Sequence, residues 1–374
     1  MLYKKYGSTD IEVSQIGFGG MRFEDQSDVD SCAALLKAAY DAGINYFDTA
    51  PGYGKSEELF GVALKEMLKT REEKPFYVSS KSWCTEPSDV RKDLETSLKR
   101  MNLDYIDFYH VWYVLSLDNY NLRKANGVLK EFEKLREEGL IRNICISSHM
   151  SGTDISEALK DYPFAGVLLG YSAMNFPYRE AGIQAASDHG MAVTVMNPLG
   201  GGIIPQNPEK FNFLKTQENE TVVEAALRFL LNDERITIAL VGLSNQAQLR
   251  EAVNAAEGCR DIPEEKIKDM RNNLSRSFDQ LCTSCCYCEG KCPQQIPVAK
   301  LMDVYNCYVL SPDKETFIKK MSLYWGIDLN TDIFDRCTEC GRCELACTQK
   351  LPIIKRLKEL REQVDKHLKS EKGK

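Results

Sequence analysis

The sequence lacks a long apolar run. A membrane-spanning helix needs about 18 consecutive apolar residues or more, and no stretch of the chain reaches that length. The beginning, MLYKKYGSTD, also lacks the apolar segment of a secretory signal. We therefore expect a cytoplasmic protein that has no membrane partner.

An excess of positive charge is also missing. The chain has 48 lysines and arginines against 55 aspartates and glutamates, a formal net charge of -7, and the two signs are interspersed. Proteins that bind nucleic acids neutralise phosphates with clustered basic side chains. No nucleic-acid partner is expected.

The G-x-G-x-x-G fingerprint of dinucleotide-binding sheets is absent as well, because the nearest stretch, GFGG at 17–20, has other spacing. Apolar runs of strand length instead alternate eight times with stretches of helical period, such as 56–68, 88–101 and 246–258. Eight such pairs predict an α/β protein whose first domain, residues 1–260, is a (β/α)8 TIM barrel. The predicted strands are 13–20, 44–50, 75–81, 104–110, 141–147, 166–172, 191–197 and 237–242.

The alternation stops at about residue 262. Residues 263–281 are rich in charge and predict a connecting helix. Two further stretches of helical pattern follow at 297–310 and 314–327. Residues 261–374 are therefore expected to form a second, mainly helical domain.

Cysteines are abundant, with 14 in the chain, and eight of them form two runs of C-x2-C-x2-C-x3-C. Without a secretory signal, metal binding is a better interpretation than disulfides. This spacing predicts two 4Fe-4S clusters, in which the fourth cysteine of each run binds the other cluster. The predicted ligands are Cys282, Cys285, Cys288 and Cys347 for one cluster, and Cys337, Cys340, Cys343 and Cys292 for the other.

The alternative for these runs is structural zinc, which usually takes its cysteines in separated pairs. Cys286 and Cys307 are left without a predicted role. The isolated cysteines are expected to be small apolar core residues. They are Cys32, Cys84, Cys145 and Cys259.

Three polar residues stand at the ends of predicted barrel strands, where this fold builds active sites. Asp48 ends the second strand, Tyr53 follows in the next loop, and Lys81 ends the third strand. A lysine buried there needs a carboxylate partner, which Asp48 can supply. Since a nearby cation lowers the pKa of a phenol, Tyr53 is expected to act as a general acid.

At these residues the chain resembles the aldo-keto reductases, over nearly the whole predicted barrel. With the cysteine runs added, it is most similar to the bacterial and archaeal branch with a C-terminal 4Fe-4S dicluster domain, of the helical two-cluster ferredoxin type. The resemblance rests on Lys81 and on the motifs GFGGMRF (17–23), DTAPGYGKSEELFG (48–61), IRNICISS (141–148), NPLGGG (197–202) and GLSNQAQLREAV (242–253).

The resemblance implies hydride transfer from NADP or NAD to the carbonyl of a small molecule, with Tyr53 as proton donor tuned by Asp48 and Lys81. It also implies a cofactor site, in which Tyr171 stacks on the nicotinamide and Gly242, Ser244 and Gln248 bind the adenosine phosphate. The implied cofactor residues are Ser147, Ser148, Tyr171, Asn197, Pro198, Leu199, Gly200, Gly242, Ser244 and Gln248.

The chain also departs from the family. A fourth catalytic residue, a histidine five positions beyond the counterpart of Asp107, is replaced by Trp112. His110 shares the strand face of that position and is the candidate for its role. The alternative is a core histidine with Trp112 lining the pocket. Ser148 and Leu168 replace the usual asparagine and glutamine that hold the nicotinamide amide.

These features predict an iron-sulfur oxidoreductase. Hydride carries two electrons and each cluster carries one, so a flavin is a possible intermediary. A ferredoxin-like protein is the expected electron partner. Simple carbonyl reduction with purely structural clusters is a further alternative. Another is a barrel without catalysis that serves as a redox sensor or docking protein.

Overall fold

The computed structural model describes residues 1–173, 179–258, 261–277, 281–283, 285–310, 316–330 and 332–372, so Cys259 lies outside the described residues. The chain divides into two compact units, Met1–Ser277 and Phe278–Lys374. Each unit is described by itself below.

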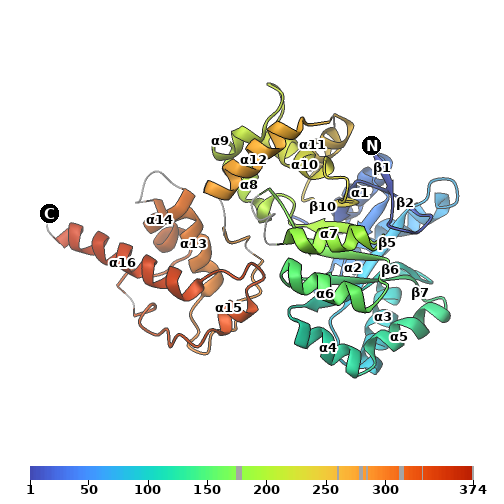
Figure 1. Cartoon of the computed structure of the whole chain (residues 1–374), viewed down its shortest axis with the longest axis horizontal. Helices are drawn as coiled ribbons and strands as arrows, with labels where there is room; N and C mark the ends of the chain where they lie inside the picture. Colours follow the sequence, from blue (N-terminus) through green and yellow to red (C-terminus); the bar gives the residue numbers. More distant parts are fainter. Residues whose placement is uncertain are drawn as a thin grey trace. The chain divides into compact units, whose positions relative to one another are not determined.

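In the described part of the first unit, parallel strands close into a barrel in the order β10-β3-β4-β5-β6-β7-β8-β9 (Figure 1). The predicted eight-stranded (β/α)8 barrel is confirmed. The register places Gly242, Gly19 and Asp48 side by side at the carboxyl ends of their strands. The strands are β3 (Ile16–Gly19), β4 (Tyr46–Asp48), β5 (Tyr77–Ser82), β6 (Ile106–Val114), β7 (Ile141–Ser148), β8 (Gly166–Gly170), β9 (Ala192–Met196) and β10 (Ile238–Gly242).

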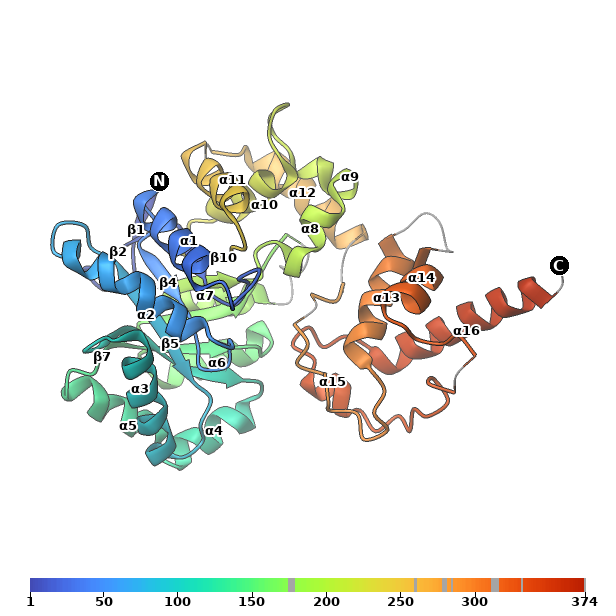
Figure 2. The same cartoon turned by 180° about the vertical axis from the view of Figure 1, so that it is seen from behind.

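Helices surround the strands of the barrel (Figures 1 and 2). Side chains cap the starts of some of them: Asp28 accepts from the Ser31 amide, and Thr221 forms a capping box with Glu224. The α-helices are α1 (Val29–Asp41), α2 (Ser56–Met67), α3 (Pro87–Met101), α4 (Leu117–Ala125), α5 (Val128–Glu137), α6 (Gly152–Asp161), α7 (Glu180–Asp188), α8 (Ile203–Gln206), α9 (Pro208–Phe211), α10 (Val222–Leu231), α11 (Gln246–Glu257) and α12 (Glu264–Ser277). The short 3₁₀ turns are η1 (Leu68–Thr70), η3 (Gly200–Gly202) and η4 (Asn212–Leu214).

An N-terminal hairpin, β1 (Tyr3–Lys5) with β2 (Glu12–Ser14), precedes the barrel and was not predicted. It delivers the buried Tyr6 to the amino-terminal end of the strands, where its ring lies 4.1 Å from that of Phe108. The turn needs glycine at Gly7, because its φ is 57° and a Cβ there would lie 2.6 Å from the Ala192 amide nitrogen. The hairpin thus fills the end of the barrel opposite to Asp48 and Lys81.

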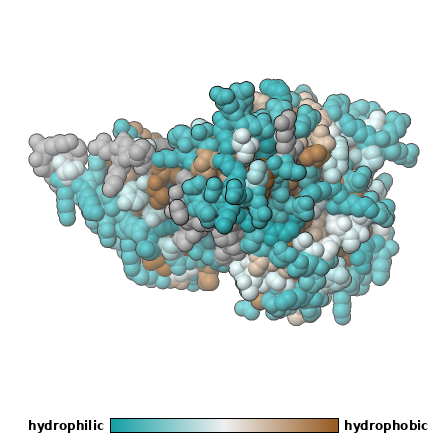
Figure 3. All heavy atoms as spheres, turned by 45° about the horizontal axis from the view of Figure 1, so that its top comes forward, coloured by the Kyte–Doolittle hydropathy of each residue, from teal (hydrophilic) through white to brown (hydrophobic). Residues whose placement is uncertain are grey.

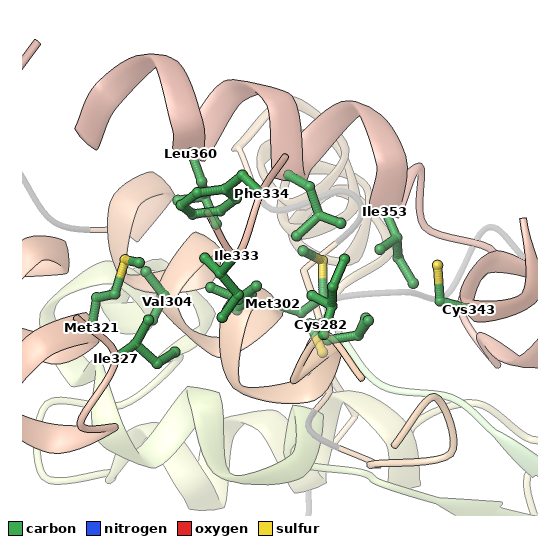
Figure 4. Close-up of a cluster of buried hydrophobic side chains, with 14 of the residues drawn as sticks. Cys282, Met302, Val304, Met321, Ile327, Ile333, Phe334, Cys343, Ile353 and Leu360 are labelled. Carbon is green, nitrogen blue, oxygen red and sulfur yellow. The ribbon is translucent and has the colours of Figure 1, made fainter. Parts of the chain in front are cut away.

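The second unit contains α13 (Val298–Leu310), α14 (Thr316–Lys319), the π-helix η5 (Lys320–Tyr324), α15 (Arg342–Ala346) and α16 (Ile353–Lys372). Its apolar core includes cysteine side chains. In Figure 4, Ile353 and Leu360 extend from α16 toward the part of the core that contains Met302 and Cys282. Thiols and aliphatic side chains therefore share one buried region.

The two cysteine runs have the same local backbone conformation. The residue after the second cysteine has a positive φ in each run, 59° at Cys286 and 72° at Gly341. The third residue after the fourth cysteine does too, 53° at Gln295 and 51° at Lys350. Each run then leads through a proline into a helix, α13 or α16. The internal repeat consequently extends beyond the cysteines.

The face seen in Figure 3 is mostly hydrophilic, and hydrophobic side chains show there only in small separate areas. Among the described residues, no helix is long and apolar enough to cross a bilayer.

Asp107 links β6 to Arg71 and to the neighbouring strand β5. Its buried carboxylate accepts from Arg71 at 2.7 and 2.8 Å and from the Val78 amide at 2.8 Å. Asp107→Ala should lower the free energy of unfolding by about 3 kcal/mol, since it leaves Arg71 and the amide without their acceptor. Urea unfolding followed by circular dichroism measures this loss.

The matched control is Glu66→Ala, which removes an exposed ion pair with Lys69 and should change the free energy of unfolding by less than about 1 kcal/mol. An equal, small effect of both substitutions would contradict the structural role given to Asp107.

Candidate active site and cysteine centre

The carboxyl ends of β4 and β5 bring together a fully buried ion pair. The Lys81 Nζ donates to Asp48 Oδ1 at 2.6 Å and to the Thr49 carbonyl at 2.7 Å. The Ser79 hydroxyl donates to the other carboxylate oxygen at 2.8 Å. Asp48 and Lys81 are at most 1 % exposed. The pair is therefore held in one geometry by hydrogen bonds from both strands.

Burial perturbs both members of this pair. It lowers the pKa of Lys81 and raises the pKa of Asp48, because it disfavours both charged forms. The contact between the two charges opposes each shift. Ser79, which supports Asp48, was not predicted, although it lies two residues before Lys81 and hence on the same face of β5.

Tyr53 lies in the loop between β4 and α2, beside the buried pair. The Lys81 Nζ is 4.9 Å from the centre of the Tyr53 ring. The Gln26 amide donates to the Tyr53 carbonyl at 2.9 Å and holds the loop. The structure thus brings Asp48, Tyr53 and Lys81 together.

Trp112 contacts the Tyr53 ring. The two rings meet edge to face with centroids 5.7 Å apart, and Trp112 also stacks on Trp83 at 5.0 Å. Gly52 fits against both indoles, where a Cβ would lie 2.6 Å from Trp83 and 2.9 Å from Trp112. These residues form an aromatic wall next to Tyr53.

Arg123 holds this aromatic wall in place and was not singled out from the sequence. Its buried guanidinium donates to the carbonyls of Trp83 and Trp112 at 2.8 and 3.3 Å. At the wall β6 is irregular, and Tyr113 has a φ of 64°.

His110 is fully buried one step deeper in the barrel, paired in register with Lys81 on β5 and Cys145 on β7. Neither ring nitrogen has a hydrogen-bond partner among the described residues. Burial, followed by the Lys81 ammonium, lowers the pKa of His110 to about 3. Its imidazole is therefore neutral near pH 7.

The residues expected to hold the nicotinamide lie at the ends of β7 and β8. The Ser147 hydroxyl is buried and has no hydrogen-bond partner among the described residues. The Ser148 hydroxyl faces the Val114 carbonyl and accepts from the Met150 amide. The Tyr171 hydroxyl donates to Glu180 at 3.0 Å. A buried, unsatisfied hydroxyl such as that of Ser147 suits a polar ligand group.

The loop after β9 contains the next predicted cofactor residues. Asn197 has a φ of 56°, and its carbonyl accepts from the Gly200 amide at 2.9 Å. Pro198 and Leu199 lie between them. This loop is thus a tight turn at the carboxyl end of the barrel.

The predicted phosphate-binding residues Gly242, Ser244 and Gln248 lie between β10 and the first turn of α11. Gln248 accepts from the Ser244 amide at 2.9 Å, and the Ser244 hydroxyl donates to the Arg22 carbonyl at 2.6 Å. A Cβ at Gly242 would lie 2.7 Å from the Arg22 side chain. Arg22 is a cation at this position that the sequence analysis had not assigned.

The second unit buries four of the eight predicted cysteine ligands and exposes one. Thr348, the residue after Cys347, has its Oγ1 3.3 Å from Cys285 Sγ. After burial, the nearby Cys285 and Cys347 contribute to the raised pKa of Cys288. The fourth cysteine of the second run is thus close to members of the first run. The ligand candidates in the apolar core are Cys282, Cys288, Cys292, Cys337, Cys343 and Cys347, whereas Cys340 is exposed.

Polar groups also converge on these sulfurs. The Leu351 amide donates to Cys347 Sγ at 3.4 Å, and Thr348 Oγ1 lies 3.3 Å from Cys285 Sγ. Within the described ranges, no group of three His, Cys, Asp or Glu side chains is arranged to hold a single metal ion. A four-iron cluster, by contrast, binds one thiolate at each iron. Buried thiols with amide donors suit such a cluster.

Comparison with known proteins assigns the first unit. Residues 15–273 match the aldo/keto reductase family. The chain belongs to this family. It is 27% identical over 311 residues to the uncharacterized oxidoreductase YqkF of Bacillus subtilis, covering 74% of this chain and 98% of that one. It is 30% identical over 297 residues to the probable aldo-keto reductase 1 of Glycine max, covering 72% and 82%.

The fold agrees with this membership. The aldo-keto reductase AKR11C1 of Bacillus halodurans, in its holo form, superimposes with a TM-score of 0.62 at 23% identity, covering 73% of this chain and 96% of that one. The protein is accordingly an oxidoreductase, and none of these comparisons supports a barrel without catalysis. The family match ends at residue 273, before the first cysteine run.

The depressed pKa of His110 predicts a specific pH dependence of stability. Between the unfolded value of about 6.5 and the folded value of about 3, the unfolded chain binds a proton that the folded barrel does not. This histidine should therefore make the free energy of unfolding fall by about 1.4 kcal/mol for each pH unit below about pH 6.

His110→Leu should remove this contribution and flatten the decline between about pH 6 and pH 4, as measured by urea unfolding at a series of pH values. Equal slopes in wild type and variant would show that the folded barrel accepts a proton on His110.

Proposed function

We propose that the barrel reduces the carbonyl group of a small organic molecule with NAD or NADP as cofactor. We also propose that the second unit carries two 4Fe-4S clusters. The observation that carries the first part is the buried Lys81–Asp48 pair beside the ring of Tyr53. The second part is supported by the spacing of the two cysteine runs and by Thr348, the neighbour of Cys347, whose Oγ1 lies 3.3 Å from Cys285 Sγ.

Proton donation is the task of Tyr53 in this proposal. The ammonium of Lys81 favours a phenolate over a phenol, so Tyr53 releases its proton to a carbonyl oxygen more readily than an isolated tyrosine. Asp48 keeps Lys81 charged in a buried place, and Ser79 orients the carboxylate. His110, neutral and fully buried on the strand beside Lys81, is better suited to packing than to this transfer.

The cofactor, when bound, supplies the hydride. The hydroxyl of Ser147 would hold the carboxamide, with Tyr171 directly after the neighbouring strand β8. Ser244 and Gln248 would lie at the phosphate with Arg22 beside them. Trp112 and Trp83 provide an apolar wall next to Tyr53 that excludes water from the reacting carbonyl.

Tyr53→Phe tests the proton donor. Removal of the hydroxyl should lower kcat for carbonyl reduction by about 10²–10⁴-fold while the barrel stays folded, because the acid is lost and the ring remains. Steady-state assays with NADPH and NADH and a panel of aldehydes and ketones measure this.

Tyr3→Phe is the control, since that hydroxyl lies on the N-terminal hairpin and donates to the Gly43 carbonyl. Unchanged carbonyl reduction in the Tyr53 variant would reject the assignment.

The clusters, when bound, would accept and release single electrons, which a ferredoxin-like partner protein can exchange. A flavin is the type of carrier that could join this one-electron chemistry to hydride transfer. The chain's own contribution is a buried set of thiols with the amide of Leu351 donating to one of them.

Cys347→Ser tests the crossed ligand set. Anaerobically purified wild-type protein should contain about eight iron and eight sulfide atoms per chain, and the variant about four of each. Cys286→Ser, an exposed thiol in the first run, is the control and should keep all eight. A wild-type protein without iron and sulfide would exclude the clusters.

A further inference from the structure

Arg356 brings a positive charge into the core of the second unit. It lies on α16 and is only 5 % exposed. Its guanidinium packs over the Tyr305 ring at 4.7 Å from the centroid. Asn306, the residue after Tyr305, accepts from the Cys282 amide at 2.9 Å and donates to the Cys282 carbonyl at 2.7 Å, so Arg356 lies in the neighbourhood of Cys282, and it follows Cys347 by nine residues at the start of α16. Both of these cysteines belong to the same proposed ligand set.

The internal repeat of the second unit has no charge at the equivalent position. Arg356 is the ninth residue after Cys347, and the ninth residue after Cys292 is Leu301, which is fully buried. The equivalence is structural, because the Leu301 amide donates to the Pro297 carbonyl and the Arg356 amide to the Pro352 carbonyl, each at 3.1 Å. One half therefore places a cation where the other places an aliphatic side chain.

Two other charges of the repeat are matched between the halves. A glutamate follows the third cysteine of each run, as Glu289 and Glu344, and a lysine stands eight residues after the fourth, as Lys300 and Lys355. Arg356 opposite Leu301 is a difference at a buried position.

We propose that Arg356 sets the two clusters at different reduction potentials, with the cluster of Cys282, Cys285, Cys288 and Cys347 the higher of the two. This inference rests on the proposed presence of the clusters. Reduction adds one electron to a cluster, and a nearby buried cation stabilises the added negative charge. The burial of Arg356 strengthens this effect, whereas the buried Leu301 at the equivalent position carries no charge.

A difference in potential gives the pair a direction. An electron that enters the second unit resides preferentially on the cluster beside Arg356. The other cluster, which has the lower potential, transfers its electron to that one.

The test is a redox titration of the anaerobically purified whole protein with dithionite, followed by electron paramagnetic resonance. Wild type should show two separate one-electron steps. Arg356→Leu, which installs the residue used by the other half, should lower the upper step by at least about 59 mV, a tenfold change in the ratio of reduced to oxidised cluster. The lower step should stay in place.

Three further variants test the effect of charge, control for a surface arginine and identify the cluster that gives the upper step. Arg356→Lys keeps the charge and should leave the upper step near its wild-type position. Arg361→Gln removes an arginine of α16 that pairs with Asp335 and Asp365 at the surface, and should move neither step. Cys340→Ser removes a ligand of the other set, so the step that remains should be the upper one.

A single step in wild type, or an upper step unmoved in Arg356→Leu with both clusters retained, would overturn the inference while leaving the clusters in place. Absence of iron and sulfide from the wild-type protein would instead overturn the proposed function together with this inference.

Discussion

The contact between the ammonium of Lys81 and the carboxylate of Asp48 is the constraint around which the barrel site is organised. Two charges without access to water are stable only if each satisfies the other, so β4 and β5 must keep their register. Ser79 and the Thr49 carbonyl use up the remaining hydrogen-bonding capacity. Tyr53 gains its electrostatic environment from this arrangement, and the neutral state of His110 follows partly from the same ammonium.

The second unit also buries polarisable groups, here the thiols of cysteines. Buried thiols lie among aliphatic side chains, and backbone amides of the loop that contains Leu351 point to them. The two runs share their left-handed residues and their proline-initiated helices, so the same local conformation is used twice. The side chains on the two helices then differ, and Arg356 opposite Leu301 is the difference that changes buried charge.

The barrel could be predicted because buried parallel strands are near-continuous apolar runs that alternate with helix-periodic stretches. Asp48, Tyr53 and Lys81 could be grouped because Asp48 and Lys81 stand at the carboxyl ends of neighbouring strands and Tyr53 follows in the adjoining loop. The hairpin that contains Tyr6 was missed, since three-residue strands carry too little periodic signal. The roles of Trp112 and His110 depend on an irregular stretch of β6, where Tyr113 adopts a positive φ. The alternation of residues along a strand does not predict such a bulge. It also does not predict that Arg123 donates to the carbonyls of Trp83 and Trp112.

The neighbourhood of Cys347 and Cys285 has a consequence for biosynthesis. These residues are separated by α13, by α14 and by the whole second cysteine run. In the proposed ligand set, the first run would stay incomplete during translation until the second had emerged from the ribosome, by which time every residue of the barrel would be available to fold. Loading of the proposed clusters would then come after synthesis of the whole barrel.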